Sequence, residues 1–88
     1  MTASTVRRRP HRIGDVATAA DRIAVTLCLA RQQQRLTQRQ LALRIGCAQS
    51  AIAEWETSVT SPRLANVADW AQALGYDLVL TRRTEEQP

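Results

Sequence analysis

The stretch LTQRQLALRIGCAQSAIAEWE, residues 36–56, decides the fold of this chain. Thr37 and Gln40 have the spacing of a capping box, in which both side-chain oxygens accept from backbone N–H groups, so a helix is predicted to begin here. Gly46 predicts the end of that helix, because glycine accepts the left-handed conformation that follows a last helical turn. A second helix is predicted from Gln49 to about Thr57. The stretch is therefore predicted to form two short helices joined by a tight turn.

Small and apolar residues of this stretch stand where two steeply crossing helices need them. Ala42 keeps the crossing point small, and Cys47 is a small apolar residue beneath the turn. Gly46 supplies the positive φ angle that the turn requires. Seven residues meet these packing requirements together: Leu41, Ala42, Ile45, Gly46, Cys47, Ile52 and Trp55. Their combination indicates a helix-turn-helix arrangement.

Helices are also predicted on both sides of this pair. Apolar residues recur at spacings of three and four along residues 15–34, which predicts a first helix there. Ser61 and Pro62 are a typical helix start, and Gly75 predicts the end of that last helix. The core of the domain is therefore expected to be helical throughout.

The segment Tyr76–Thr81 alternates and is rich in β-favouring residues, which predicts a short strand. The expected fold class is all-α, with four to five helices and a short C-terminal β-strand. We expect a basic arm over residues 1–13, disordered when free. The helix-turn-helix domain then covers residues 14–81, with the motif at 37–57 and the strand at 76–81, before a flexible tail over residues 82–88.

The net charge of +4 belongs to the N-terminal arm. Between Asp15 and Leu80, six arginines are matched by six acidic residues, and the two arginines of the tail are matched by two glutamates. The arm has four arginines and no acidic residue: Arg7, Arg8, Arg9 and Arg12. A cationic arm suits a polyanion, although basic tails also serve solubility alone.

No group of residues indicates an enzyme, a cofactor or a metal ion. Cys28 and Cys47 are too few and too far apart for a zinc site or a disulfide framework, so both are interpreted as small buried hydrophobes. His11 has no neighbour that would make it a general base or a metal ligand. The sequence also lacks a catalytic dyad, a phosphate-binding loop, a membrane-spanning apolar run and a secretory signal. We therefore expect a non-enzymatic cytoplasmic protein.

Four motifs give the chain a family resemblance: Leu36-Thr37-Gln38, the run from Ile52 to Glu56, Ser61-Pro62, and the run from Ala71 to Gly75. In these the chain resembles the Cro and lambda-type repressors, also called the Xre family, over about residues 29–80. The resemblance implies a lambda-repressor-like fold. It also implies a transcriptional regulator, by family habit a repressor, that binds double-stranded DNA and is associated with the nucleoid.

The resemblance makes the helix from Gln49 the recognition helix, which lies in the major groove with its N-terminal residues toward the bases. Gln49 is expected to bond N6 and N7 of adenine. Ser50 and Ala53 follow on the exposed face, where Ala53 can only touch a thymine methyl group. Glu54 either accepts a hydrogen bond from cytosine N4 or repels phosphate and so sharpens specificity, and the two alternatives weigh about equally.

Phosphate contacts are expected from residues around the recognition helix. Gln38 and the free N–H groups at the start of its helix suit a phosphate. Arg39 is a better candidate than Arg44, and Arg63 stands where relatives reach DNA. Arginines of the arm either enter the minor groove or attract phosphates without specificity. The arm candidates are Arg7, Arg8 and Arg9.

Arg31 and Glu56 match a family ion pair that ties the first helix to the end of the recognition helix, and a partly buried pair is expected. Two positions depart from the family pattern. Ser58 stands where glycine is usual, and Ala48 stands where serine or threonine is usual. Both lie at ends of the recognition helix.

Three hypotheses follow for the function. The first is a repressor that binds a palindromic operator as a homodimer, paired through the C-terminal strand, because one recognition helix reads too few base pairs. The second is an antitoxin that binds its own promoter and also a toxin protein. The third is an accessory protein-interaction domain with a relic helix-turn-helix. The exposed face of the recognition helix and the basic arm favour the first.

Overall fold

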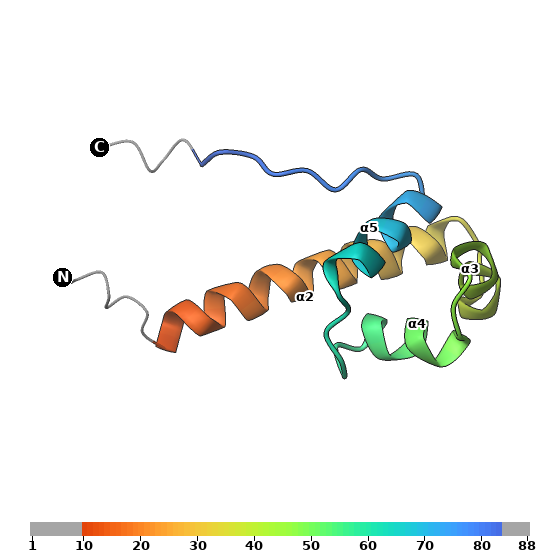
Figure 1. Ribbon diagram of the computed structural model, residues 1–88, viewed down its shortest axis with the longest axis horizontal. Coiled ribbons are helices and arrows are strands. Elements are labelled where there is room, and N and C mark those ends of the chain that lie inside the picture. The colour runs from red at the N-terminus through yellow and green to blue at the C-terminus, as the bar shows by residue number, and fades with distance from the viewer. Residues whose placement is uncertain (1–9, 84–88) are drawn as a thin grey trace.

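The computed structural model describes residues 10–83, and within them the chain is helical without any strand. The helices are α2 (Pro10–Gln33), α3 (Gln38–Ile45), α4 (Gln49–Glu56) and α5 (Leu64–Ala73). Helix α2 is by far the longest, and the three short helices gather around its C-terminal half (Figure 1). This arrangement confirms the predicted all-α domain.

The capping box predicted at the start of α3 and the turn predicted at its end are both present. The Gln40 backbone N–H donates to Thr37 Oγ1 at 3.0 Å, and the Thr37 N–H donates to Gln40 Oε1 at 2.8 Å, which completes the capping box. Gly46 has a φ of 88°, and its N–H and that of Cys47 both donate to the Ala42 carbonyl oxygen. These local bonds end α3 and direct the chain into α4.

The core lies where the three short helices meet α2. Leu41 from α3, Ile52 from α4 and Trp70 from α5 are its fully buried large side chains. Trp55 packs against Trp70 with their ring centroids 5.6 Å apart. Helix α2 contributes three buried residues of one face: Ala24, Leu27 and Ala30. Because α3 and α4 are only eight residues each, this shared core is what keeps them helical.

Two helix starts differ from the predictions. Helix α2 begins at Pro10 and not near Asp15, so residues 10–13 of the expected arm are helical. Proline is compatible with the first position of a helix, because a backbone N–H in the first turn has no hydrogen-bond partner within the helix. Helix α5 begins at Leu64, with Arg63 in an extended conformation at its N-cap, so Ser61-Pro62 precedes the helix as loop. Residues 1–9 of the arm lie outside the described part.

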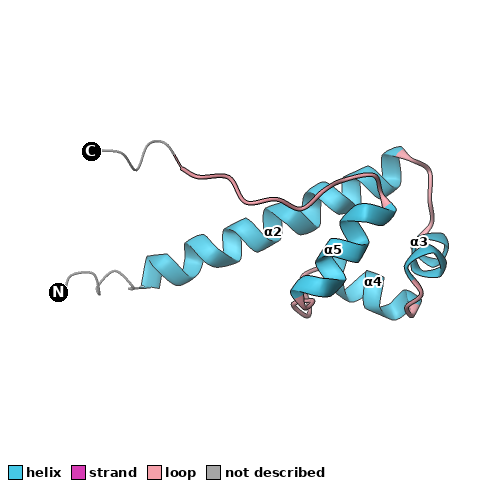
Figure 2. Ribbon diagram, turned by 45° about the horizontal axis from the view of Figure 1, so that its top comes forward, coloured by secondary structure: helices cyan, strands magenta, loops and turns pink. Residues whose placement is uncertain are grey.

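The C-terminal strand predicted for residues 76–81 is not formed. Residues 76–83 leave α5 as an irregular segment that runs back in the direction of the N-terminal end of α2 (Figures 1 and 2). A strand requires a neighbouring strand for its backbone hydrogen bonds. The rest of the described chain is helix and loop, so a single copy supplies no such neighbour. Residues 84–88 of the predicted tail lie outside the description.

The molecule is elongated, with extents of 48 × 25 × 20 Å. Its radius of gyration is 15.6 Å, whereas a compact domain of this length has one of about 12 Å. The excess comes from the N-terminal half of α2 and from the segment after α5, which both project beyond the short helices on the same side (Figure 2). No helix in residues 10–83 is long and apolar enough to cross a bilayer.

Candidate nucleic-acid interface

Helix α4 has one buried side and one exposed side. Ile52 and Trp55 point into the core, whereas Gln49, Ser50 and Glu54 are exposed. Ala53 is half-buried, and its carbonyl oxygen accepts a hydrogen bond from Thr57 Oγ1 at 2.8 Å. The three exposed residues expected to read bases are therefore all presented to solvent by one helix, with Ala53 at the margin of that face.

The N-terminal end of α4 is left without a side-chain cap. Ala48 takes the N-cap position with an extended backbone and makes no side-chain cap hydrogen bond. The first turn has no acidic residue. The first N–H groups of a helix carry partial positive charge, so the uncapped end beside Gln49 is suited to an electronegative group.

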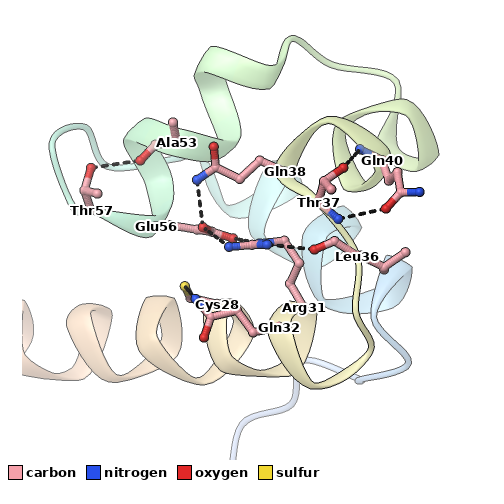
Figure 3. A network of polar contacts seen from close by, with 10 residues as sticks. All are labelled: Cys28, Arg31, Gln32, Leu36, Thr37, Gln38, Gln40, Ala53, Glu56 and Thr57. Carbon is pink, nitrogen blue, oxygen red and sulfur yellow. Dashed lines mark hydrogen bonds and ion pairs between the residues drawn. The ribbon is translucent and has the colours of Figure 1, made fainter.

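A polar network holds the other end of α4 (Figure 3). Arg31 of α2 donates to both carboxylate oxygens of Glu56, from Nε at 2.6 Å and from Nη2 at 3.0 Å. The same guanidinium donates through Nη1 to the Leu36 carbonyl oxygen at 2.7 Å. Only 12% of the Arg31 side chain and 3% of the Glu56 side chain is exposed. The ion pair implied by the resemblance is thus bidentate and mostly buried. Its two hydrogen bonds hold the guanidinium and the carboxylate in one relative orientation.

Gln38, the first residue of α3, completes this network. Its Nε2 donates to Glu56 Oε1 at 3.0 Å, so Gln38 links the start of α3 to the end of α4. The sequence suggested a phosphate contact for Gln38 and did not suggest this bond. The sequence did contain an indication of the bond between Gln38 and Glu56, because a buried carboxylate needs hydrogen-bond donors besides a single arginine. One Nε2 hydrogen remains for another acceptor.

Burial and hydrogen bonding act on the Glu56 carboxyl in opposite directions. Burial alone would raise its pKa, but the hydrogen bonds from Arg31 and Gln38 and the arginine charge outweigh burial, so the pKa lies below its ordinary value. The hydrogen bond to Glu56 raises the pKa of Arg31 despite desolvation. Both partners are therefore charged at neutral pH.

Cys28 lies beside this network in Figure 3, and Gln32 Nε2 is 3.8 Å from its sulfur. Burial, followed by the negative charge of Glu56, raises the pKa of the Cys28 thiol, and burial raises that of Cys47. Both cysteines are free and half-buried, so they are less enclosed than the sequence interpretation assumed. Among residues 10–83, no group of His, Cys, Asp or Glu could hold a metal ion.

Ser58, which departs from the family pattern, lies just after the end of α4. Ser58 has a φ of 60°, which is the left-handed conformation that glycine adopts most easily. The backbone N–H groups of Ser58 and Val59 donate to the Trp55 and Glu54 carbonyl oxygens and so close the end of α4. Ser58 Oγ also donates to Asp21 Oδ1 of α2 at 3.0 Å, a link the sequence did not suggest.

The arginine candidates have different surroundings. Arg39, in the first turn of α3, and Arg63, at the N-cap of α5, are both exposed. Arg44 donates through Nη1 to the Ala73 carbonyl oxygen at 3.3 Å, which ties α3 to the end of α5. Thr60 Oγ1 lies 3.5 Å from Glu54 Oε1 in the loop after α4. Arg7, Arg8 and Arg9 are outside the described residues.

A family model described as helix-turn-helix matches residues 29–80, more than half of the chain. The chain belongs to the Cro-like (Xre) helix-turn-helix family. The matched stretch is the same one over which the resemblance was found in the sequence, and it contains α3, the turn and α4. Other helix-turn-helix proteins are therefore its relatives.

One curated relative supports this placement. The chain is 35% identical over 65 residues to a protein of Sinorhizobium fredii named "Uncharacterized HTH-type transcriptional regulator y4dL". The alignment covers 74% of this chain and 33% of that protein, so the chain spans about a third of the length of its relative. No solved structure matches the chain significantly.

Proposed function

We propose that this helix-turn-helix protein is a sequence-specific regulator of transcription that represses by occupying an operator in double-stranded DNA. The observation that best supports this proposal is the difference between the two ends of α4. Arg31 and Gln38 hold its C-terminal end through Glu56, while its N-terminal end is uncapped and exposed. A helix fixed at one end and open at the other can enter the major groove with its first residues toward the bases.

Base reading is assigned to the exposed face of α4. Gln49 bonds adenine N6 and N7, and Ser50 takes an adjacent polar contact. Ala53, at the margin of this face, meets a thymine methyl group. Glu54 accepts from cytosine N4 or excludes other sequences by repulsion, and neither alternative is favoured by its exposed position.

Phosphate binding is assigned to residues around this face. Gln38 retains one amide hydrogen for a phosphate oxygen, and Arg39 within the motif and Arg63 after it are both exposed. The arginines of the arm add attraction to the backbone or to the minor groove: Arg7, Arg8 and Arg9. Because α4 presents no arginine or lysine, these outer contacts supply most of the affinity.

The regulator is proposed to act as a homodimer on a palindrome, with the segment 76–81 at the dimer interface. Two recognition helices related by a two-fold axis double the number of bases read, with half-sites about one helical turn apart. The single copy leaves this segment without a strand partner, which is compatible with pairing between copies.

Selection of bound sequences from a random pool of duplex DNA tests the function. We expect the selection to recover a palindrome with a required adenine in each half-site. With the Gln49→Ala variant, that adenine should no longer be required. Recovery of random sequences at low salt, with no enrichment over several rounds, would refute sequence-specific binding. A single enriched half-site would refute the dimer and leave specific binding intact.

A further inference from the structure

An apolar groove of about 760 Å³ lies between α2, α5, the loop that joins α4 to α5, and residues 78–80. Ile23 of α2 and Leu64 and Val67 of α5 line it, and the aromatic residues Trp55 and Trp70 border it. Pockets that bind organic molecules have volumes of about 300–1,000 Å³ and are lined mostly by apolar and aromatic side chains, with a few polar groups. The groove therefore has the size and the lining of a small-molecule site.

The polar residues of the groove come from α2 and from the loop after α4. Asp21 of α2 is the only charged residue among the described residues that line the groove. Three hydroxyl residues of the loop line it as well: Ser58, Thr60 and Ser61. Ser58 Oγ donates to Asp21 Oδ1 at 3.0 Å, which ties this loop to α2. A carboxylate accepts hydrogen bonds on both of its oxygens, so this bond leaves Asp21 able to hold a cation.

A single carboxylate in an apolar lining selects a ligand by its charge. An organic cation can place its apolar part in the groove and its positive charge beside Asp21, whereas the same carboxylate repels an organic anion of equal shape. The two indole rings that border the groove favour the same sign of charge, because the face of an indole attracts cations. Charge complementarity therefore points to a positively charged apolar molecule.

We propose that this groove is a binding site for a lipophilic organic cation, with the apolar part of the ligand against Ile23, Leu64 and Val67 and its charge beside Asp21. The proposal goes beyond operator binding and does not depend on it. The groove reaches α4 at Trp55, on the buried side of that helix, whereas the residues assigned to base reading lie on the exposed side. A bound cation therefore contacts the recognition helix without covering its DNA-reading face.

Titration of the full chain with two probes of opposite charge, in the absence of DNA, tests the site. Tetraphenylphosphonium is a lipophilic cation, and tetraphenylborate is an anion of nearly the same size and shape, so the two probes differ mainly in charge. They are added to separate samples. The chain has two tryptophans, and both border the groove, so tryptophan fluorescence reports binding without a label.

Two pairs of variants locate the bound cation. Asp21→Asn removes the charge but keeps an oxygen for the Ser58 hydrogen bond, and its control is Asp69→Asn, at an exposed position of α5 outside the groove lining. Ala20→Phe places a large side chain on the groove lining, and its control is Ala65→Phe, which is exposed on α5 and absent from that lining. Circular dichroism establishes that all four variants fold.

We expect tetraphenylphosphonium to bind the unaltered chain and both control variants with the same affinity. Asp21→Asn should weaken binding by about threefold to fivefold, as the loss of one exposed charge pair does. Ala20→Phe should weaken it by about tenfold or more, because the added ring occupies the space of the ligand. Absence of binding, or equal affinities for Asp21→Asn and Asp69→Asn, would overturn the proposal. It would also be overturned if tetraphenylborate bound as tightly as the cation and Ala20→Phe weakened that binding.

The concentration of the protein distinguishes the cation from another occupant. If a second copy of the chain covered the groove, the affinity for tetraphenylphosphonium would fall as the protein concentration rises, and such a fall would refute the site. Binding of the selected operator is measured separately. A chain that binds the operator but not the cation would refute the groove site and leave the regulator intact. A chain that binds the cation but no DNA would refute the regulator and leave the groove site intact.

Discussion

The carboxylate of Glu56 accepts hydrogen bonds from Arg31 and Gln38, on two other helices, while its side chain is almost fully enclosed. Removing one partner of a buried pair leaves the other charge without compensation, which costs about 3–5 kcal/mol. Glu56→Ala is therefore expected to lower the free energy of unfolding by this amount, as measured by urea denaturation. Glu54→Ala, an exposed neighbour on the same helix, serves as the control and is expected to change it by less than about 0.5 kcal/mol.

The pH dependence of stability follows from the lowered pKa of Glu56. In the unfolded chain this carboxyl takes up a proton near pH 4.3, whereas the folded chain resists protonation to a lower pH. The unfolded state then binds more protons, so stability is lost as the pH falls from about 5 through the pKa of the folded state. The Glu56→Gln variant is expected to have a shallower loss than the wild type between pH 5 and 3. Parallel curves for the two proteins would contradict the lowered pKa.

Gln49 is expected to be the residue that reads adenine. Gln49→Ala should weaken binding to the selected operator by about 1–3 kcal/mol and remove the preference at one base pair of each half-site. Fluorescence anisotropy with operators altered at that base pair measures both effects. The matched control is Gln72→Ala, an exposed glutamine of α5. Equal losses at every base pair would instead make Gln49 a non-specific contact.

At the scale of elements, the end of α4 combines a strained residue with a link to α2. A left-handed conformation costs a non-glycine residue about 1 kcal/mol, but Ser58 also donates to Asp21. Ser58→Gly removes both the strain and the hydrogen bond, so its net effect on stability is expected to be small. In an Asp21→Ala background the bond is already lost, and the same substitution is expected to stabilise by about 1 kcal/mol. An equal effect in both backgrounds, measured by thermal unfolding, would show that the link contributes nothing.

The elements that the sequence predicted best are those with local signals. The capping box at Thr37 and the turn at Gly46 each depend on residues within one helical turn, and both are present as predicted. The starts of α2 and α5 were misplaced by a few residues, because Pro10 and Pro62 are each compatible with a helix start and with a loop. The strand at 76–81 depends on a neighbour, which the pattern of one segment does not contain.

The candidate site shows the same division. The exposed face of α4 follows from helical periodicity, so Gln49, Ser50 and Glu54 lie where the sequence placed them. The bonds of Gln38 to Glu56 and of Ser58 to Asp21 join residues 18 and 37 positions apart. Such contacts depend on how the helices are stacked, so local pattern did not reveal them.

At the scale of the whole molecule, the charge distribution predicts how salt acts on DNA binding. Residues 10–83 contain nine arginines and six acidic residues spread along the chain, whereas residues 1–9 contain three consecutive arginines and no acidic residue. Each phosphate that is neutralised adds about 0.9 to the slope of log affinity against log salt. Deleting residues 1–9 is therefore expected to weaken binding and to reduce that slope by about two to three per chain. Deleting residues 84–88, which carry two glutamates, is the control, and an unchanged slope in the arm deletion would exclude arm contacts.

The network around Glu56 has a consequence for the life of the protein in a cell. Arg31 reaches α4 from the last turns of α2, and an eight-residue helix does not persist alone. A fluctuation that frees the end of α2 breaks this polar link and weakens the hold on α4, so the backbone of α4 opens more readily. Under the proposed function, the copies that have lost the ability to hold DNA are then the same copies that a protease can cut. Clearance would remove inactive molecules first, and the abundance of the protein would follow the number of competent copies.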